Sequence, residues 1–219
     1  MFVGHYAAAL AAKSAEPRAP LWMFVAGCQL LDIAWGGFLI AGVEKVRFNP
    51  ALPGSALELY FMPYSHSLPA ALIWSVVAAV LALSVMKLPR RAGMLIGMVV
   101  FSHWVLDFLV HRPDLELWFG GPKVGLGWWN QPFPEMVVEM GLLAVAGAAW
   151  VAQRKGAGAT AWPAVAFIAV LVAVQWIGVQ TPDGGGAASL GAMALATYLA
   201  VTAISVFVDR GRRGGELAA

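Results

Sequence analysis

The sequence has few charged residues: Asp, Glu, Lys and Arg make up only 12% of its 219 residues. A typical soluble domain contains about 25% of them. Because 60% of the residues are hydrophobic and the mean hydropathy is +0.74, an ordinary soluble domain is excluded. At this length, residues 1–219 form a single transmembrane domain, and little chain remains for a soluble one.

Cysteine and net charge are also scarce. Cys28 is the only cysteine, which excludes a disulfide framework, and its place in an apolar segment indicates a small buried side chain. The formal net charge is +2 and no basic aromatic patch is present, so nucleic acid is not an expected partner. The N-terminus lacks the basic region of a signal peptide, and we expect this segment to be retained.

Six apolar segments approach the length of about 20 residues that a helix needs to cross a membrane. These segments are Pro20–Val43, Ser67–Val85, Ala92–Val110, Phe133–Val151, Trp162–Val179 and Ala187–Val208. No alternating strand pattern is present, so the sequence predicts an all-α polytopic membrane bundle, with about six transmembrane helices plus a short N-terminal helix. Residues 1–152 would form the metal-site helices. The two additional apolar helices in residues 153–219 carry no charge within their spans, and we expect them only to pack.

The basic residues lie mainly on one side of this arrangement. With the N-terminus in the cytoplasm, ten of the 14 Lys and Arg residues face the inside. The four that face outside are Lys45, Arg47, Arg112 and Lys123. The positive-inside rule therefore predicts that both termini are cytoplasmic.

Ionisable side chains interrupt the apolar segments. Asp32 lies in the first predicted span, and His103 and Asp107 lie in the third. Placing such a group in hydrocarbon costs a few kcal/mol, so these residues generally face the inside of a bundle and carry function. All four histidines of the chain lie within its first 111 residues, as do these carboxylates. The combination predicts a metal site inside the bundle.

His103, Asp107 and His111 are four residues apart in turn and share one helix face. Imidazole and carboxylate groups in that arrangement can share one cation or bridge two. Glu135 and Glu139 have the same spacing at the start of the next span. A structural charge pair between His103 and Asp107 is the alternative.

Several neighbouring residues have simpler explanations. His111 follows the helix and is typical of a membrane interface, while Asp114 and Glu116 are expected to be solvated in the loop. For Glu139, the simpler explanation is a hydrogen bond to a neighbouring helix. The roles of His111 and Glu139 stay open.

The N-terminal segment Met1–Ala12 is apolar but too short to cross a membrane. We expect it to re-enter the bundle and carry His5 about 12 Å inward, because it has no polar face. The alternative is a helix that lies flat on the membrane. Two long loops, Glu44–Ser65 and His111–Pro132, lie on the predicted outer face and have the length of lids or binding loops. Their aromatic residues suit a membrane interface equally well.

The motifs GHYAAAL, LLD, SHS and SHWVLDFLVHRPDLELW resemble, in order and spacing, those of the bacterial inner-membrane metal-dependent hydrolases. These LexA-binding, inner-membrane-associated hydrolases are distantly similar to zinc-dependent phospholipase C. The resemblance covers roughly residues 1–145 and implies a bacterial inner-membrane protein. The metal ligands it implies are His5, Asp32, His66, His103 and Asp107. Met62, Pro63 and Tyr64 replace the family's His-Arg-Gly, and Asp32 stands without the family's further acids, so the number of metal ions stays open.

The favoured hypothesis is a zinc-type hydrolase that acts on a phosphoester or another lipid-like substrate at the membrane surface. A divalent metal, zinc by this hypothesis, would acidify a bound water, and Asp32, Asp107 or Glu135 would be the general base. Arg112 or Lys123 would meet a phosphate. The alternatives are a haem-binding subunit, an ion or proton carrier and a non-catalytic assembly subunit. The expected partners are the lipid bilayer and this substrate; the oligomeric state is not predicted.

Overall fold

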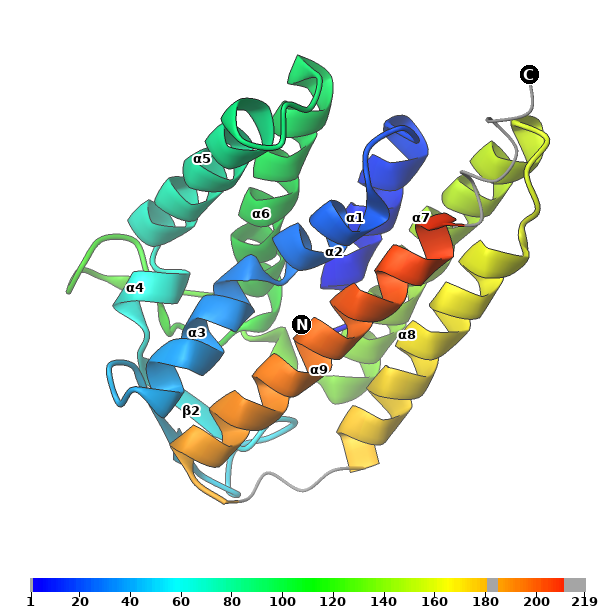
Figure 1. Cartoon of the computed structure of the whole chain (residues 1–219). Coiled ribbons are helices and arrows are strands. Elements are labelled where there is room, and N and C mark those ends of the chain that lie inside the picture. The colour runs from blue at the N-terminus through cyan, green and yellow to red at the C-terminus, as the bar shows by residue number, and fades with distance from the viewer. Residues whose placement is uncertain (1, 181–184, 211–219) are drawn as a thin grey trace.

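The computed structural model describes residues 2–180 and 185–210, and most of these residues are helical (Figure 1). The α-helices are α1 (His5–Ala15), α2 (Leu21–Cys28), α3 (Leu30–Ile40), α4 (Pro63–His66), α5 (Leu68–Ser84), α6 (Arg90–Val110), α7 (Pro132–Gly156), α8 (Trp162–Gln180) and α9 (Ala187–Arg210). The remaining elements are β1 (Lys45–Phe48), β2 (Leu57–Phe61), β3 (Leu115–Glu116), β4 (Lys123–Val124) and the 3₁₀ turn η1 (Trp128–Asn130). The predicted all-α class is confirmed.

Four helices among the described residues are long and apolar enough to cross a membrane: α6, α7, α8 and α9. Helix α5 has 17 residues, fewer than the roughly 20 that a straight crossing needs. The predicted first span, Pro20–Val43, is divided at Gln29 into α2 and α3, which are bent by 54°. The structure therefore indicates a membrane protein with four long spans, or five if the bent pair is one crossing, and six is not established by length.

Helix α1 lies inside the bundle. It contacts α2, α6 and α7, and Tyr6 and Leu10 on it are fully buried. A helix lying flat on the surface would leave one side open, whereas His5, at the start of α1, is only 1% exposed. The N-terminal segment therefore reaches the interior, as the re-entrant prediction requires.

Helix α9 runs alongside the bent pair α2–α3, and α5 runs beside α6 (Figure 1). The close approach of α3 and α9 depends on two glycines, because a Cβ on Gly191 would lie 2.5 Å from the carbonyl oxygen of Gly36. Small residues at such contacts let helix backbones approach closely. At the other end of α9, the buried ammonium of Lys13 forms an ion pair of 2.8 Å with Asp209. Helix α9 is thus held against the first half of the chain.

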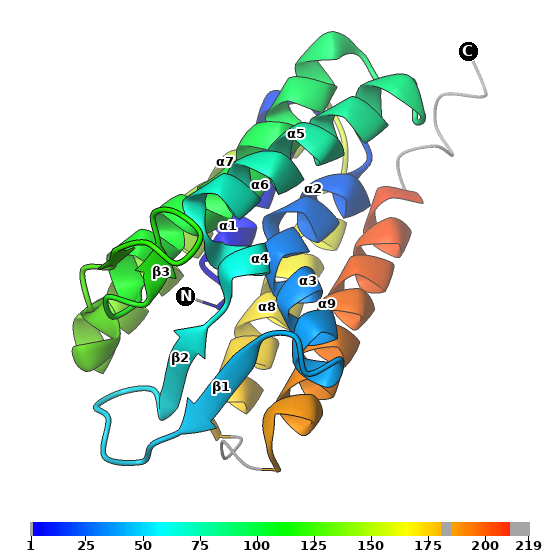
Figure 2. The same cartoon turned by 90° about the vertical axis from the view of Figure 1, so that its left-hand side faces the viewer.

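The two long loops form short antiparallel hairpins at one end of the bundle (Figure 2). β1 pairs with β2, and β3 pairs with β4. Arg112 donates hydrogen bonds of 2.6–3.2 Å to three backbone carbonyls of the β1–β2 hairpin. Lys123 donates one of 2.6 Å to the carbonyl of Tyr60. Both cations were candidate phosphate ligands in the sequence; in the structure they tie the two hairpins together instead.

Two apolar clusters make up the buried core. The first includes Cys28 and Val99, and the second includes Leu31 and Val100. The boundary between the clusters therefore runs through the bend between α2 and α3 and through the middle of α6. The polar side chains that interrupt the predicted spans lie at this boundary.

Candidate metal centre

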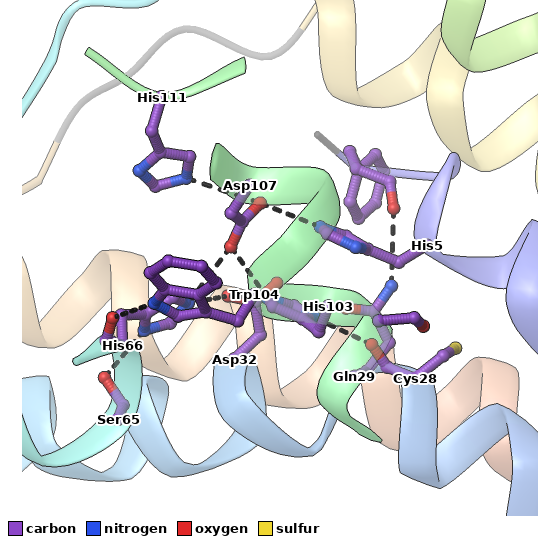
Figure 3. Close-up of polar contacts among 12 residues, drawn as sticks. His5, Cys28, Gln29, Asp32, Ser65, His66, His103, Trp104, Asp107 and His111 are labelled. Carbon is purple, nitrogen blue, oxygen red and sulfur yellow. Dashed lines mark hydrogen bonds and ion pairs between the residues drawn. The ribbon is translucent and has the colours of Figure 1, made fainter. Parts of the chain in front are cut away.

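Asp107, in the last turn of α6, lies at the centre of a group of four imidazoles (Figure 3). Its Oδ1 lies 3.1 Å from Nε2 of His5 and 3.5 Å from Nε2 of His111. Its Oδ2 lies 3.1 Å from Nε2 of His103 and 3.5 Å from Nε2 of His66. All five residues are buried. The two carboxylate oxygens thus face different pairs of histidines.

Asp32 joins this group from the first turn of α3. Its Oδ1 lies 3.3 Å from Nε2 of His66 and 3.6 Å from Nε2 of His103. Its Oδ2 accepts a hydrogen bond of 2.8 Å from the phenol of Tyr198 on α9. One oxygen of Asp32 therefore faces the cluster, and the other is fixed from behind.

The distances within the cluster fit a metal site. Ligand atoms about 2.0–2.2 Å from a tetrahedral zinc ion lie about 3.3 Å from one another. The six nitrogen–oxygen distances in the cluster run from 3.1 to 3.6 Å. Two triads, His5–His103–Asp107 and Asp32–His66–His103, have ligand atoms close enough to hold a metal ion. The structure therefore shows buried His and Asp groups able to bind a metal.

The bend between α2 and α3 determines which nitrogen of His103 faces the cluster. The break at Gln29 leaves the carbonyl of Cys28 without a helical partner, and Nδ1 of His103 lies 2.7 Å from that oxygen. A carbonyl only accepts hydrogen bonds, so Nδ1 must carry the proton. Neutral His103 then presents the lone pair of Nε2 to the cluster, which is the usual arrangement of a metal-binding histidine.

His66 is oriented by a chain of two hydrogen bonds. The hydroxyl of Ser65 donates to Oε2 of Glu44 at 2.6 Å, and Nδ1 of His66 lies 2.7 Å from the same hydroxyl oxygen. Because the hydroxyl proton is given to Glu44, the hydroxyl accepts from Nδ1 of His66. Its Nε2 therefore also carries a lone pair, directed toward Asp32 and Asp107. The indole of Trp104 fixes the His66 backbone by donating to its carbonyl at 3.0 Å.

His111 follows the same rule. Its Nδ1 lies 2.9 Å from Oδ1 of Asp114, a carboxylate that accepts the proton, and Nε2 is left to face Asp107. The ring of Trp129 covers the imidazole, with 4.0 Å between ring centroids. His111 is 4% exposed and its Nε2 lies beside Asp107, so its role, left open in the sequence, includes a contact with the cluster.

The loop acids were expected to be solvated, and this expectation is wrong. The carboxylate of Asp114 is mostly covered and pairs with His111. Glu116 is 5% exposed and accepts a hydrogen bond of 2.8 Å from the backbone of Gly120. The contacts of Arg112 with the neighbouring hairpin hold this loop against the bundle, which buries Glu116 and covers most of Asp114.

In their neutral forms, His66, His103 and His111 thus present lone pairs to carboxylate oxygens. Among the described residues, Nε2 of His103 forms no hydrogen bond, and neither do the two ring nitrogens of His5. Acceptors that face one another at 3.1–3.6 Å repel unless a proton or a cation lies between them. Protons on two of the imidazoles would balance the charge of the two carboxylates but leave the other two imidazoles without a partner for their lone pairs. A divalent cation balances the same charge and also accepts the lone pairs of neutral imidazoles.

Glu139, on α7, holds the N-terminal segment in place. Its Oε1 accepts hydrogen bonds from the backbone N–H groups of Phe2 and of Gly4, the latter at 2.9 Å. Its Oε2 accepts one of 3.1 Å from the side-chain amide of Gln175 on α8. The role left open in the sequence is therefore to position the chain directly before His5.

The cluster opens into a cavity of 870 Å³. Asp32, His66, Asp107 and His111 lie on its wall together with Glu135, which is 8% exposed. Glu135 makes none of the short contacts with imidazole nitrogens that Asp32 and Asp107 make among the described ion pairs. It therefore lines the same space without belonging to the ligand cluster.

The sequence interpretation missed the residues that support the cluster from behind. These are Glu44, Ser65, Gln175 and Tyr198, together with the carbonyl of Cys28. Tyr198 and Gln175 lie on the two helices that were expected only to pack. The expectation that those helices offer no polar chemistry is wrong, because each contributes one buried side chain to the site.

Comparison with known proteins adds no relatives. The sequence matches no protein-family model, and neither a curated protein nor a solved structure is significantly similar to the chain.

Proposed function

We propose that this chain is a membrane-embedded, metal-dependent hydrolase of the zinc type that acts on a phosphoester of a lipid-like substrate. The observation that carries the proposal is the convergence of imidazole lone pairs and carboxylate oxygens around Asp107 at spacings of 3.1–3.6 Å. The ordered motifs that resemble the inner-membrane metal-dependent hydrolases support the same assignment.

The ligands in this proposal are His5, Asp32, His66, His103 and Asp107, with His111 as a sixth. A catalytic zinc ion takes three protein ligands and keeps its fourth position for water, so these six residues would be enough to hold two ions. When bound, such ions supply an acidified water and polarise a phosphoryl or acyl oxygen.

Residues of the protein would serve as ligands, as the general base and as the groups that orient the ligands. Asp32 and Asp107 face imidazoles and serve as ligands. Glu135, on the cavity wall, is then the carboxylate free to take a proton from the attacking water, as a general base does. The partners on Nδ1 of His66, His103 and His111 keep the rings in one tautomer and orientation.

The alternatives fit the geometry less well. A haem with two histidine ligands needs the porphyrin between them, but Nε2 of His66 and of His103 both lie within 3.5 Å of the same oxygen of Asp107. A proton carrier needs acids spread across the depth of the membrane. Asp32 and Asp107 instead share two histidines, which favours one compact site.

The proposal includes a bacterial inner-membrane location, both termini in the cytoplasm and six crossings. The bent pair α2–α3 would be one crossing and α5 another. The bend itself supports this, because non-helical backbone at membrane depth is tolerated where it lines a buried polar site.

Hydrolysis by the purified protein in lipid nanodiscs tests the proposal. Chelator-treated protein should be inactive toward a panel of lipid phosphoesters, and zinc should restore release of phosphate or of the phosphorylated head group. Equal hydrolysis with and without zinc would refute a zinc-dependent activity. No hydrolysis of any member of the panel by zinc-loaded protein would refute the proposed hydrolase activity.

A further inference from the structure

A cleft between α8 and α9 continues from the metal cluster toward the outside of the bundle. One side of its lining consists of Val174, Gln175, Ile177, Gly178 and Val179 on α8. The other side runs along α9 from Leu190 to Ile204. Figure 1 shows the two helices separating toward their connected ends. The cleft is the outer part of the 870 Å³ cavity, whose volume lies within the usual range of about 300–1,000 Å³ for ligand sites.

The two helices that flank the cleft are long and apolar enough to cross a membrane. Both carry large, exposed apolar side chains: Trp176 is 69% exposed, Ile177 62% and Leu199 55%. In a bilayer these side chains would be in contact with hydrocarbon. In that setting an apolar cleft is surrounded by lipid chains, which are as apolar as leucine.

The inner end of the cleft is polar. Tyr198 lies on its wall and donates to Asp32, and Gln175 lies opposite and donates to Glu139. Between this polar end and the outer end, the wall of α9 consists mainly of small or aliphatic residues, including Ala194, Ala200 and Val201. The polarity of the cleft therefore matches that of a lipid: its long part is apolar, and its inner end is polar and lies beside the proposed metal-binding cluster.

We propose that the α8–α9 cleft binds one aliphatic chain of a membrane lipid, which enters sideways from the bilayer with its head group at the His and Asp cluster. The identity of the head group rests on the proposed function; binding of the chain does not. The last two helices then have a specific role, which is to select a substrate by its hydrocarbon chain. The metal ligands come from the part of the protein that precedes α7.

Photo-crosslinking in nanodiscs tests the inference. The full-length protein is reconstituted in phosphatidylcholine doped with a phosphatidic acid that carries a diazirine in the middle of one acyl chain. After irradiation, the labelled residues are mapped by mass spectrometry. We expect the label on cleft residues of α8 and α9, and Ala200→Trp, which fills the cleft, should lower this label roughly fivefold or more.

Ala203→Trp is the matched control, because Ala203 is exposed on the same helix but does not line the cleft. It should leave cleft labelling unchanged. Metal content measured on the same samples reports on the folded site.

Two outcomes separate this inference from the hydrolase. In one outcome, the protein retains its metal, the label is confined to the outer faces of the helices, and Ala200→Trp does not change it. This outcome would overturn lipid binding in the cleft and leave the proposed metal site unaffected. Label in the cleft of a protein that contains no metal would support the cleft and count against the hydrolase.

Discussion

The phenol of Tyr198 donates a hydrogen bond of 2.8 Å to Oδ2 of Asp32, a residue 166 positions earlier in the chain. The contact joins α9 to α3, and it holds a carboxylate of the cluster from behind through a neutral donor. Because Oδ2 is occupied in this way, Oδ1 of Asp32 is the oxygen that faces His66 and His103.

Removing this hydroxyl should weaken metal binding without unfolding the protein. Tyr198→Phe keeps the ring and loses only the hydrogen bond, and loss of such an outer contact lowers metal affinity by about 10–100-fold. A competitive chelator titration measures the change. Tyr64→Phe is the control, since Tyr64 is 49% exposed. Equal affinities for the two variants would show that Tyr198 does not position Asp32.

The hydrogen-bond chain behind His66 makes a similar prediction. Ser65→Ala removes the hydroxyl between Glu44 and Nδ1 of His66, so the imidazole is free to change tautomer and rotate. We expect metal affinity to fall by about tenfold. Ser84→Ala, in an exposed turn of α5, should have no effect. Unchanged affinity in Ser65→Ala would contradict the orientation assigned to His66.

Glu139 gives a prediction about one part of the cluster. Glu139→Gln replaces a carboxylate that accepts from the Phe2 and Gly4 backbone, so the segment that carries His5 should loosen. If two ions are bound, elemental analysis should show loss of the one that depends on His5, and His5→Ala should give the same stoichiometry. A Glu139→Gln protein with the full wild-type metal content would show that His5 is positioned by α1 alone.

Glu135 is predicted to act on the reaction and not on the metal. Glu135→Gln keeps the shape of the side chain and removes its ability to take a proton, so turnover should fall by about 10²–10⁴-fold. Metal content should stay at the wild-type level because Glu135 is outside the ligand cluster. The kinetic loss and the metal content are measured on the same preparation; loss of both together would make Glu135 a ligand instead.

Sequence spacing predicts the part of the site that lies along one helix: His103 and Asp107 are four residues apart on α6, and His111 follows its last residue. His5, Asp32 and His66 were predicted as ligands through the resemblance of the motifs. The contacts of Tyr198 and Gln175 could not be predicted in this way, because a single polar side chain in an apolar helix does not reveal which distant residue it faces.

The bend at Gln29 could not be predicted from the sequence either. No proline lies within α2 or α3 to signal a break, and the apolar run continues through it. The structure shows why the bend matters: it exposes the carbonyl that fixes His103. The burial of Glu116 and the partial cover of Asp114 likewise depend on packing between two loops that are distant in sequence, which composition alone does not encode.

Metal content of the wild-type protein tests the central claim most directly. Protein purified without chelators should contain a stoichiometric transition metal by elemental analysis, and His103→Ala and Asp107→Asn should each lose it, since a metal ligand must supply a lone pair or a negative charge. Circular dichroism should show that both variants stay helical. If the wild-type protein holds no stoichiometric metal, and both substitutions only lower its thermal stability, the cluster is a structural charge network and the account is contradicted.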